Sequence, residues 1–200
     1  MLAALATFCF VSSITPGPNN LMLLASGANF GFRRTVPHLM GVCLGFAAMV
    51  FLVGMGVGSL FAAYPALYDV LRVAAIVYML WLAWRIATSS GLGETSASAR
   101  PMSFVEAVAF QWINPKAWAM ALGATAAFVS PETFVVGVTI VTVVFAAVNL
   151  PCIASWAGFG VVLRRFLDRP RALRAFNVTM ALLLVASLYP MVEGLGRYGL

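Results

Sequence analysis

Charged residues are scarce in this chain: 9% of its 200 residues are Asp, Glu, Lys or Arg, against roughly 25% in an average protein. Hydrophobic residues make up 62%, and the mean hydropathy is +0.98. A water-soluble domain with so few charges could not keep its surface hydrated. The composition therefore predicts an integral membrane protein, and the length allows about five to seven spans of about 20 residues each.

Several kinds of reactive residue are also missing. The chain has one histidine, His38, and its three cysteines form no C-x-x-C pair, so no metal site, thiol–disulfide centre or other cofactor is expected. It has no phosphate-binding loop, which excludes ATP-driven transport by this chain alone. It has no basic helix with interleaved aromatics, so nucleic acid is not an expected partner.

The basic residues are distributed unevenly along the chain. Six spans are expected, at about residues 2–28, 37–67, 68–87, 103–128, 133–163 and 175–192. The loops after spans one, three and five carry most of the basic residues: Arg33, Arg34, Arg85, Arg100, Arg164, Arg165, Arg169, Arg171 and Arg174. The positive-inside rule places the loops around Arg33, Arg100 and Arg165 in the cytoplasm and both termini outside.

Six spans divide into two halves of three that enter the bilayer in opposite directions. The predicted fold is an all-α membrane protein, a single transporter domain over residues 1–200 with two inverted three-helix repeats. The repeats cover about 1–88 and 103–193, with a linker at about 89–102. Residues 10–18 (FVSSITPGP) and 110–118 (FQWINPKAW) place a proline at similar depth in helices 1 and 4. Two prolines also match by chance, so the pairing alone does not establish the repeat.

The first span contains an unusual break. Pro16, Gly17 and Pro18 are followed by Asn19 and Asn20, which is turn chemistry inside an apolar run. Prolines free backbone carbonyls that find no water in a bilayer, so such a break is expected where it lines a cavity or packs against other protein. The helix end after the break carries partial positive charge and favours a carboxylate. These residues are candidate substrate ligands; a packed structural kink is the alternative.

The second break, Asn114-Pro115-Lys116, carries the only lysine. A lysine near mid-membrane costs about 2.5–3.5 kcal/mol on insertion scales and is too short to reach water from there. Lys116 should therefore face a cavity, a substrate carboxylate or the carbonyls freed in the first span. Gln111 precedes it on the same helix and could line the same cavity. Tying down the broken helix is the alternative role for Lys116.

Three further polar residues lie in the spans. Glu106 is a candidate for proton coupling, although a carboxylate near a helix start is an equally good explanation. Asn149, with Pro151, predicts a third and weaker break in span five and a further substrate ligand, although a lone Asn also serves as an interhelical hydrogen bond. His38 follows Pro37 near the start of span two, where a structural role is favoured over titration.

Three segments together resemble the LysE/RhtB family of bacterial amino-acid exporters: TPGPNNLMLLASGANFGFRRTVPHLMGVCLGF, YMLWLAWRIA and FQWINPKAW. The resemblance covers essentially the whole chain. It implies a helical inner-membrane protein of about 200 residues that expels amino acids, in antiport with protons. The family's P-G-P segment carries over to Pro16–Pro18 and its N-P-K segment to Asn114–Lys116. The runs TPGPNN and WLAWRIATS look most like the cysteine/O-acetylserine branch.

The sequence thus predicts a proton-coupled exporter of small amino acids or their derivatives, with the bilayer, protons and the amino acid as its partners. A passive channel or a structural membrane subunit is the alternative, and Gly41-x-x-x-Gly45 would also allow a homodimer. An intramembrane enzyme is disfavoured because no nucleophile–base pair or metal set lies at depth.

Overall fold

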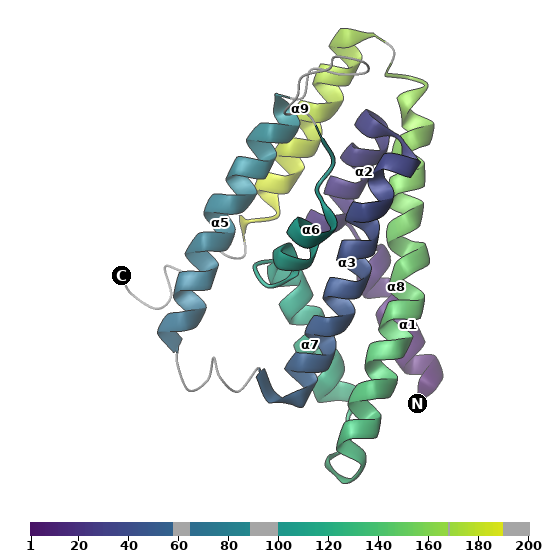
Figure 1. Cartoon of the computed structure of the whole chain (residues 1–200), viewed down its shortest axis with the longest axis vertical. Helices are drawn as coiled ribbons and strands as arrows, with labels where there is room; N and C mark the ends of the chain where they lie inside the picture. Colours follow the sequence, from purple (N-terminus) through teal and green to yellow (C-terminus); the bar gives the residue numbers. More distant parts are fainter. Residues whose placement is uncertain (58–64, 89–99, 168, 190–200) are drawn as a thin grey trace.

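The computed structural model describes residues 1–57, 65–88, 100–167 and 169–189. These residues are helical and contain no strand. The elements, in chain order, are α1 (Leu2–Ile14), α2 (Pro18–Phe30), α3 (Phe32–Leu52), the π-helical η1 (Val53–Val57), α5 (Pro65–Ala87), α6 (Phe104–Gln111), α7 (Pro115–Phe128), the 3₁₀ turn η2 (Pro131–Thr133), α8 (Phe134–Arg164) and α9 (Pro170–Ala186). They form an elongated bundle, with α8 along one long side and α5 and α9 along the other (Figure 1).

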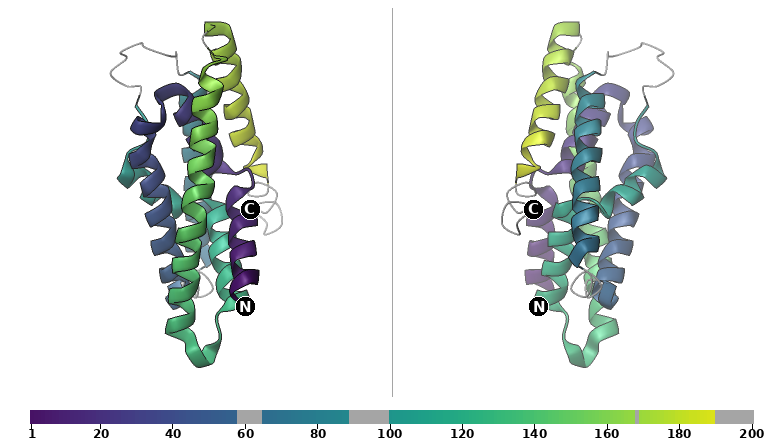
Figure 2. Two further views of the ribbon diagram at one scale, coloured as in Figure 1. Left: turned by 90° about the vertical axis from the view of Figure 1, so that its right-hand side faces the viewer. Right: turned by 90° about the vertical axis from the view of Figure 1, so that its left-hand side faces the viewer.

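Within the described residues, two helical segments are long and apolar enough by themselves to cross a membrane, Phe32–Val57 and Pro131–Arg164. The other apolar helices are shorter, and α1 and α2 contain 13 residues each. A helix of that length spans about 20 Å, less than the roughly 30 Å hydrocarbon core. Neither α1 nor α2 alone can therefore cross a bilayer, and the two together have to form one span. Both helices pack along α8, whose length the side views show (Figure 2).

Both predicted major breaks are present. α1 ends at Ile14 and α2 begins at Pro18, and α6 ends at Gln111 while α7 begins at Pro115. The weaker break predicted at Asn149–Pro151 is wrong, because α8 continues through it. One proline removes one N–H from a long helix, which neighbouring turns tolerate. The first span loses two N–H groups within three residues, with a glycine between them.

The last helix begins earlier than predicted. α9 starts at Pro170 rather than near Ala175, with the proline at its first position, where no N–H is needed. Arg171 and Arg174 therefore lie in the first turns of α9 and not in a loop. Most of the predicted linker, and the predicted end of this span at Val192, lie outside the described residues.

Small residues set the two closest helix crossings. A Cβ atom on Gly27 of α2 would collide with the carbonyl oxygen of Ala157 on α8, and one on Gly160 would collide with that of Leu24. Residues 24 and 27 thus face residues 157 and 160, backbone against backbone. Gly41 similarly brings α3 against the start of α6. The glycine face of α3 is therefore used for packing within the chain.

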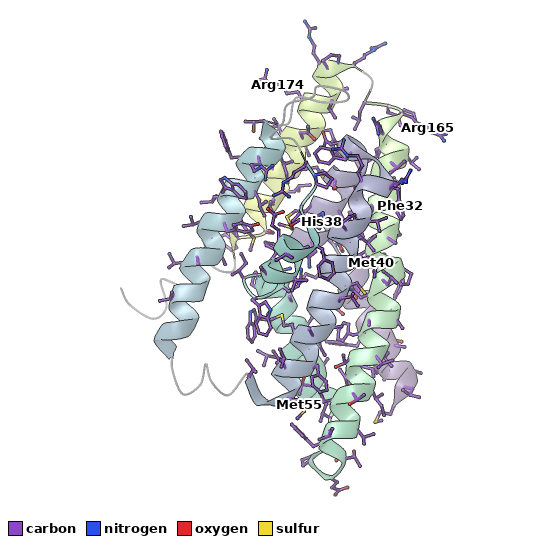
Figure 3. The ribbon with its side chains drawn as sticks, viewed as in Figure 1. Phe32, His38, Met40, Met55, Arg165 and Arg174 are labelled. Carbon is purple, nitrogen blue, oxygen red and sulfur yellow. The ribbon has the colours of Figure 1, made fainter. Side chains whose placement is uncertain are left out.

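Arginines mark one end of the bundle. Arg165 and Arg174 lie at that end with Phe32 near them, whereas Met55 lies toward the opposite end (Figure 3). The N-terminus also lies toward the opposite end (Figure 1). We call the first of these the arginine end. The fold thus brings the start of α3, at Phe32, to the same end as the arginines around the junction of α8 and α9.

Candidate functional site at two helix breaks

Lys116 joins the two breaks. Its ammonium Nζ donates to the Thr15 carbonyl at 2.7 Å, to the Thr15 hydroxyl at 2.9 Å and to the Pro16 carbonyl at 3.3 Å. These three acceptors use all three donors of the ammonium. Room for the lysine comes from Gly17, where an added Cβ would lie 2.6 Å from Lys116 Cδ. The backbone of Gly17 is extended, so closeness to Lys116, and not its conformation, requires a glycine there.

The carbonyls at the end of α1 are satisfied by side chains. Thr15 Oγ1 donates to Ser12 O at 3.0 Å, and Asn20 Nδ2 donates to both Ser13 O and Thr15 O at 2.8 Å. Trp156 Nε1, from α8, donates to Ile14 O at 3.0 Å. A helix end in a bilayer cannot leave its last carbonyls to water. Each of the freed carbonyls from Ser12 to Pro16 therefore has a named donor.

The second break is closed by its own residues. Asn114 is the N-cap of α7, and its side-chain oxygen accepts from the Lys116 backbone N–H at 3.1 Å. Pro115 takes the first helical position, where the missing N–H costs nothing. Trp118 Nε1 donates to the Trp112 carbonyl at 2.8 Å. These contacts fix the direction in which α7 leaves the break and aim Lys116 at Thr15.

A reciprocal amide pair links the two broken helices on the other side. Asn19 Nδ2 donates to Gln111 Oε1 at 2.8 Å, and Gln111 Nε2 donates to Asn19 Oδ1 at 3.3 Å. Gln111 also donates to the carbonyl of Ala107, one turn earlier on α6, at 2.8 Å. The amide of Gln111 is fully buried. The two breaks are thus joined by a charged contact and a neutral one.

A small cavity lies between these contacts, with a volume of about 30 Å³. Polar residues from both breaks and from α8 line it: Ser12, Ser13, Gly17, Asn19, Asn20, Asn114, Lys116 and Asn149. The hydroxyl of Ser13 is buried and has no hydrogen-bond partner. About 30 Å³ holds one water molecule, whereas ligand sites occupy roughly 300–1,000 Å³. The cavity is therefore too small, in this conformation, to hold an amino acid.

Similarity to known proteins assigns the chain to a family. Residues 10–187 match the model of the family described as LysE type translocator. The chain belongs to the LysE type translocator family. This translocator is similar to the cysteine/O-acetylserine efflux proteins of Escherichia coli (strain K12) and Shigella flexneri serotype 5b (strain 8401). It is 34% identical to each over 189 residues, which cover 92% of this chain and 94% of the relative. No solved structure gives a significant match.

Family membership settles the protein class. A LysE type translocator is an integral membrane transport protein and not an enzyme, in agreement with the prediction from composition. The family match, residues 10–187, includes both helix breaks and the residues that line the cavity between them. The resemblance of the three sequence segments to this family is therefore confirmed.

Most of the sequence-predicted residues of the translocator converge on the cavity. Gly17, Asn19, Asn20, Asn114, Lys116 and Asn149 line it, and Gln111 holds Asn19. Pro16, Pro18 and Pro115 shape the breaks rather than line the cavity; Pro18 and Pro115 each occupy a first helical position. Asn149 contributes from a continuous α8, so it reaches the cavity without the break predicted around it.

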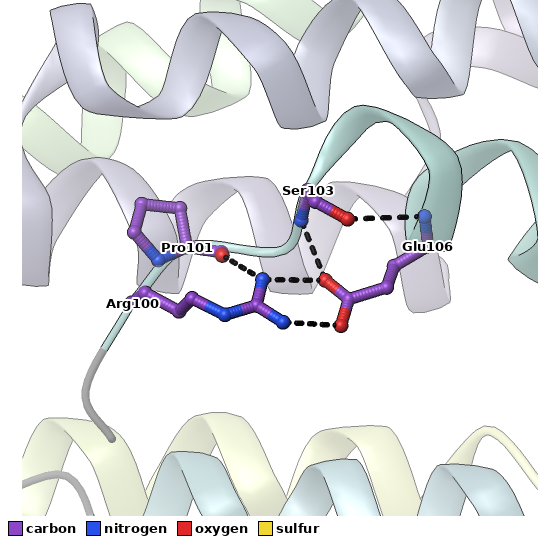
Figure 4. A network of polar contacts seen from close by, with 4 residues as sticks. All are labelled: Arg100, Pro101, Ser103 and Glu106. Atoms are coloured by element: carbon purple, nitrogen blue, oxygen red, sulfur yellow. Dashed lines mark hydrogen bonds and ion pairs between the residues drawn. The ribbon is translucent and has the colours of Figure 1, made fainter. Parts of the chain in front are cut away.

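Glu106 lies elsewhere. Its carboxylate binds Arg100 through two hydrogen bonds of 2.6 and 2.7 Å, and accepts from the Ser103 backbone N–H at 2.7 Å (Figure 4). Ser103 Oγ in turn accepts from the Glu106 N–H, which completes a capping box at the start of α6. Hydrogen bonds and charge from Glu106 raise the pKa of Arg100. Glu106 therefore lies at a helix start, as the alternative to a proton-coupling role predicted.

Two residues that bind groups at the first break, Thr15 and Trp156, were not predicted from the sequence. Thr15 supplies two of the three Lys116 acceptors, and its place just before Pro16 was the available signal. Trp156, which holds Ile14, lies in mid-α8 and 142 residues away. A tryptophan in an apolar run gives no indication of its partner, so only the fold reveals this contact.

Proposed function

We propose that this translocator is a secondary active exporter of small amino acids or their derivatives across the bacterial inner membrane. The single observation that carries the proposal is the contact of Lys116 with the broken first span. It places a cation, the side-chain-bonded carbonyls of the unwound segment and a helix N-terminus around one cavity. Those are the groups that a zwitterion requires. The named function of the relatives supports cysteine and O-acetylserine as the first substrates to test.

Binding would proceed by exchange of partners. The substrate carboxylate takes Lys116 Nζ and the first-turn N–H groups of α2, where the helix dipole is positive. The substrate ammonium takes the Thr15 and Pro16 carbonyls that Lys116 then leaves. The exchange keeps each charge paired, so no isolated charge is created at depth. Asn20 and Asn149 line the same cavity and offer hydrogen bonds to the substrate's side chain.

Transport requires the closed cavity to open to each side in turn. We assign the motion to two inverted repeats, one containing the α1–α2 break and the other the α6–α7 break, which rock against each other. The repeats are residues 1–88 and 103–193, joined by the linker at 89–102. The arginine end faces the cytoplasm by the positive-inside rule, and both termini lie outside.

Proton antiport is the proposed energy source. Glu106 is the acidic residue on the two broken spans, and it lies on α6 about one and a half turns from Gln111. In liposomes with an imposed pH gradient, we expect the wild-type protein to accumulate substrate and Glu106→Gln to lose this pH-driven step. A passive channel would not accumulate substrate under pH alone.

The test of the function uses the purified full chain in proteoliposomes with labelled O-acetyl-L-serine and L-cysteine. Lys116→Ala should insert normally and lose transport, whereas Gly158→Ala, whose new Cβ meets nothing within 4 Å, should transport as wild type. If the correctly inserted Lys116→Ala protein moved substrate as fast as wild type, the assignment of Lys116 would fail. If no amino acid moved in wild type, the proposed function would fail.

A further inference from the structure

A second and much larger cavity lies toward the arginine end of the bundle. Its volume is about 510 Å³, within the range of small-molecule sites. Residues of α2, α3, α5 and the segment leading into α6 form its walls. It contains none of the residues that line the cavity at the two breaks. The two cavities are therefore separate in this conformation.

His38 is the unexplained polar group in this second cavity. Its side chain is 2% exposed and lines the cavity, and neither ring nitrogen has a hydrogen-bond partner. Figure 3 places His38 in the interior of the bundle. A buried imidazole normally satisfies at least one nitrogen, because an unmet donor or acceptor destabilises the fold. A ligand with polar groups would supply what the protein does not.

The ion pair of Arg100 and Glu106 forms another part of the wall, and it retains unused capacity (Figure 4). Arg100 has five N–H donors, and three are used, two by Glu106 and one by the Pro101 carbonyl at 3.3 Å. The Glu106 carboxylate likewise has lone pairs beyond those facing Arg100 and Ser103. The pair thus offers free donors for an anion beside free acceptors for a cation.

Aromatic side chains complete the wall. Tyr78 and Trp81 of α5 line the cavity, with ring centroids 5.4 Å apart and the rings tilted by 33°. The guanidinium of Arg85 lies over the Trp81 ring, 5.0 Å from its centroid, so this ring already binds one cation. Aromatic faces attract an ammonium group through their quadrupole. The cavity wall thus offers adjacent positive and negative groups, aromatic faces and an unpartnered imidazole. These groups match a free α-amino acid, whose ammonium and carboxylate are attached to the same carbon.

The two cavities share walls on both broken spans, namely α2 and the span formed by α6 and α7. On α2, Asn19 lines the first cavity, while Met22, Ser26 and Asn29 line the second, all on one helical face. On the other broken span, Glu106 lines the second cavity and Asn114 the first. The amide pair of Asn19 and Gln111 lies where the two sets approach each other: Asn19 is a residue of α2 that lines the first cavity, and Gln111 falls between Glu106 and Asn114 along the chain.

We propose that the larger cavity is a loading site, which binds the zwitterionic substrate before it passes the Asn19–Gln111 pair to reach Lys116. The substrate carboxylate binds the free N–H groups of Arg100, and its ammonium binds Glu106 and the aromatic faces. His38 donates to the substrate as well. This inference rests on the proposed function, because it takes the transported amino acid as the ligand and the arginine end as the side of loading.

The site can be tested in a Lys116→Ala background, which removes the inner site. The purified protein is titrated with labelled O-acetyl-L-serine and with its isomer N-acetyl-L-serine, which has the same atoms but no ammonium. Binding is measured by equilibrium dialysis, and a ligand-induced change in tryptophan fluorescence that is lost in Trp81→Phe reports the location. We expect saturable binding of the first compound and at least about tenfold weaker binding of the second, since a hydrogen bond to a charged group is lost.

Two variants in that background assign the residues. Glu106→Gln should weaken binding of O-acetyl-L-serine by about tenfold, although glutamine preserves the capping box and hence the start of α6. Gly158→Ala should bind as the background protein does. Unchanged binding in Glu106→Gln, or no saturable binding in Lys116→Ala, would overturn the loading site.

The two proposals fail separately. If wild type exports amino acids while Lys116→Ala binds nothing, the loading site is refuted and the function stands. If Lys116→Ala binds O-acetyl-L-serine at Trp81 while wild type moves no amino acid, the binding site stands and its role in loading is refuted.

Discussion

The crossing of α2 and α8 makes a sharp prediction about two glycines on the same helix. A Cβ on Gly160 would collide with Leu24 O and lie 2.9 Å from Ala28 N, whereas a Cβ on Gly158 would meet nothing within 4 Å. Both residues lie inside α8 and differ by two positions. Alanine substitution at each therefore makes the same chemical change in opposite environments.

The expected magnitudes follow from those environments. The neighbours of Gly160 are backbone atoms of another helix and cannot rotate away, so the helices must separate. Overpacking of this kind costs about 1–3 kcal/mol of unfolding free energy. At Gly158 alanine gains helix propensity, up to about 1 kcal/mol. Gly160→Ala makes the same gain, so the two variants should differ by the overpacking cost alone, about 1–3 kcal/mol, with Gly160→Ala the less stable.

The assay is unfolding of the purified variants in one detergent, by denaturant or heat, followed through helical circular dichroism. Gly27→Ala, which would strike Ala157 O from the other side of the crossing, should be destabilised like Gly160→Ala. Equal stability of Gly160→Ala and Gly158→Ala would show that α2 and α8 do not meet through their backbones. Proposals that depend on the relative placement of these helices would then lose their basis.

Three further substitutions examine the first break. Gly17→Ala, with its Cβ 2.6 Å from Lys116 Cδ, should displace the lysine and reduce transport in proteoliposomes while the protein still folds. Trp156→Phe leaves Ile14 O without its donor and should lower the unfolding free energy by about 1–3 kcal/mol in the detergent assay. Thr15→Val removes one acceptor that competes with substrate for Lys116, so the KM for transport should fall about threefold to tenfold; an unchanged KM would contradict the exchange of partners.

Sequence reasoning located both helix breaks because their signals were local. Two prolines around a glycine interrupt a helix whatever surrounds them, and a lysine in an apolar span has to find polar partners. Those rules led to Pro16, Pro18 and Lys116, and the structure brings Lys116 to Thr15 and Pro16. The prediction could name the two sides of the contact because each was anomalous alone.

The remaining features depend on packing that no local rule contains. Asn149 reaches the cavity although α8 does not break there, since the neighbouring turns tolerate one proline. α9 begins before the predicted membrane boundary, because a helix with arginines in its first turns can extend beyond the bilayer into water. Trp156 finds Ile14 only once α8 has been packed beside α1.

The donors at the end of α1 also constrain how this sequence can change. Thr15, Asn20, Lys116 and Trp156 hold the freed carbonyls through their side chains, from three separate helices and the break itself. Replacing any one of them strands a carbonyl that the other three are not placed to reach. The costs of substitutions at these positions should therefore add, because none of the four side chains compensates for the loss of another.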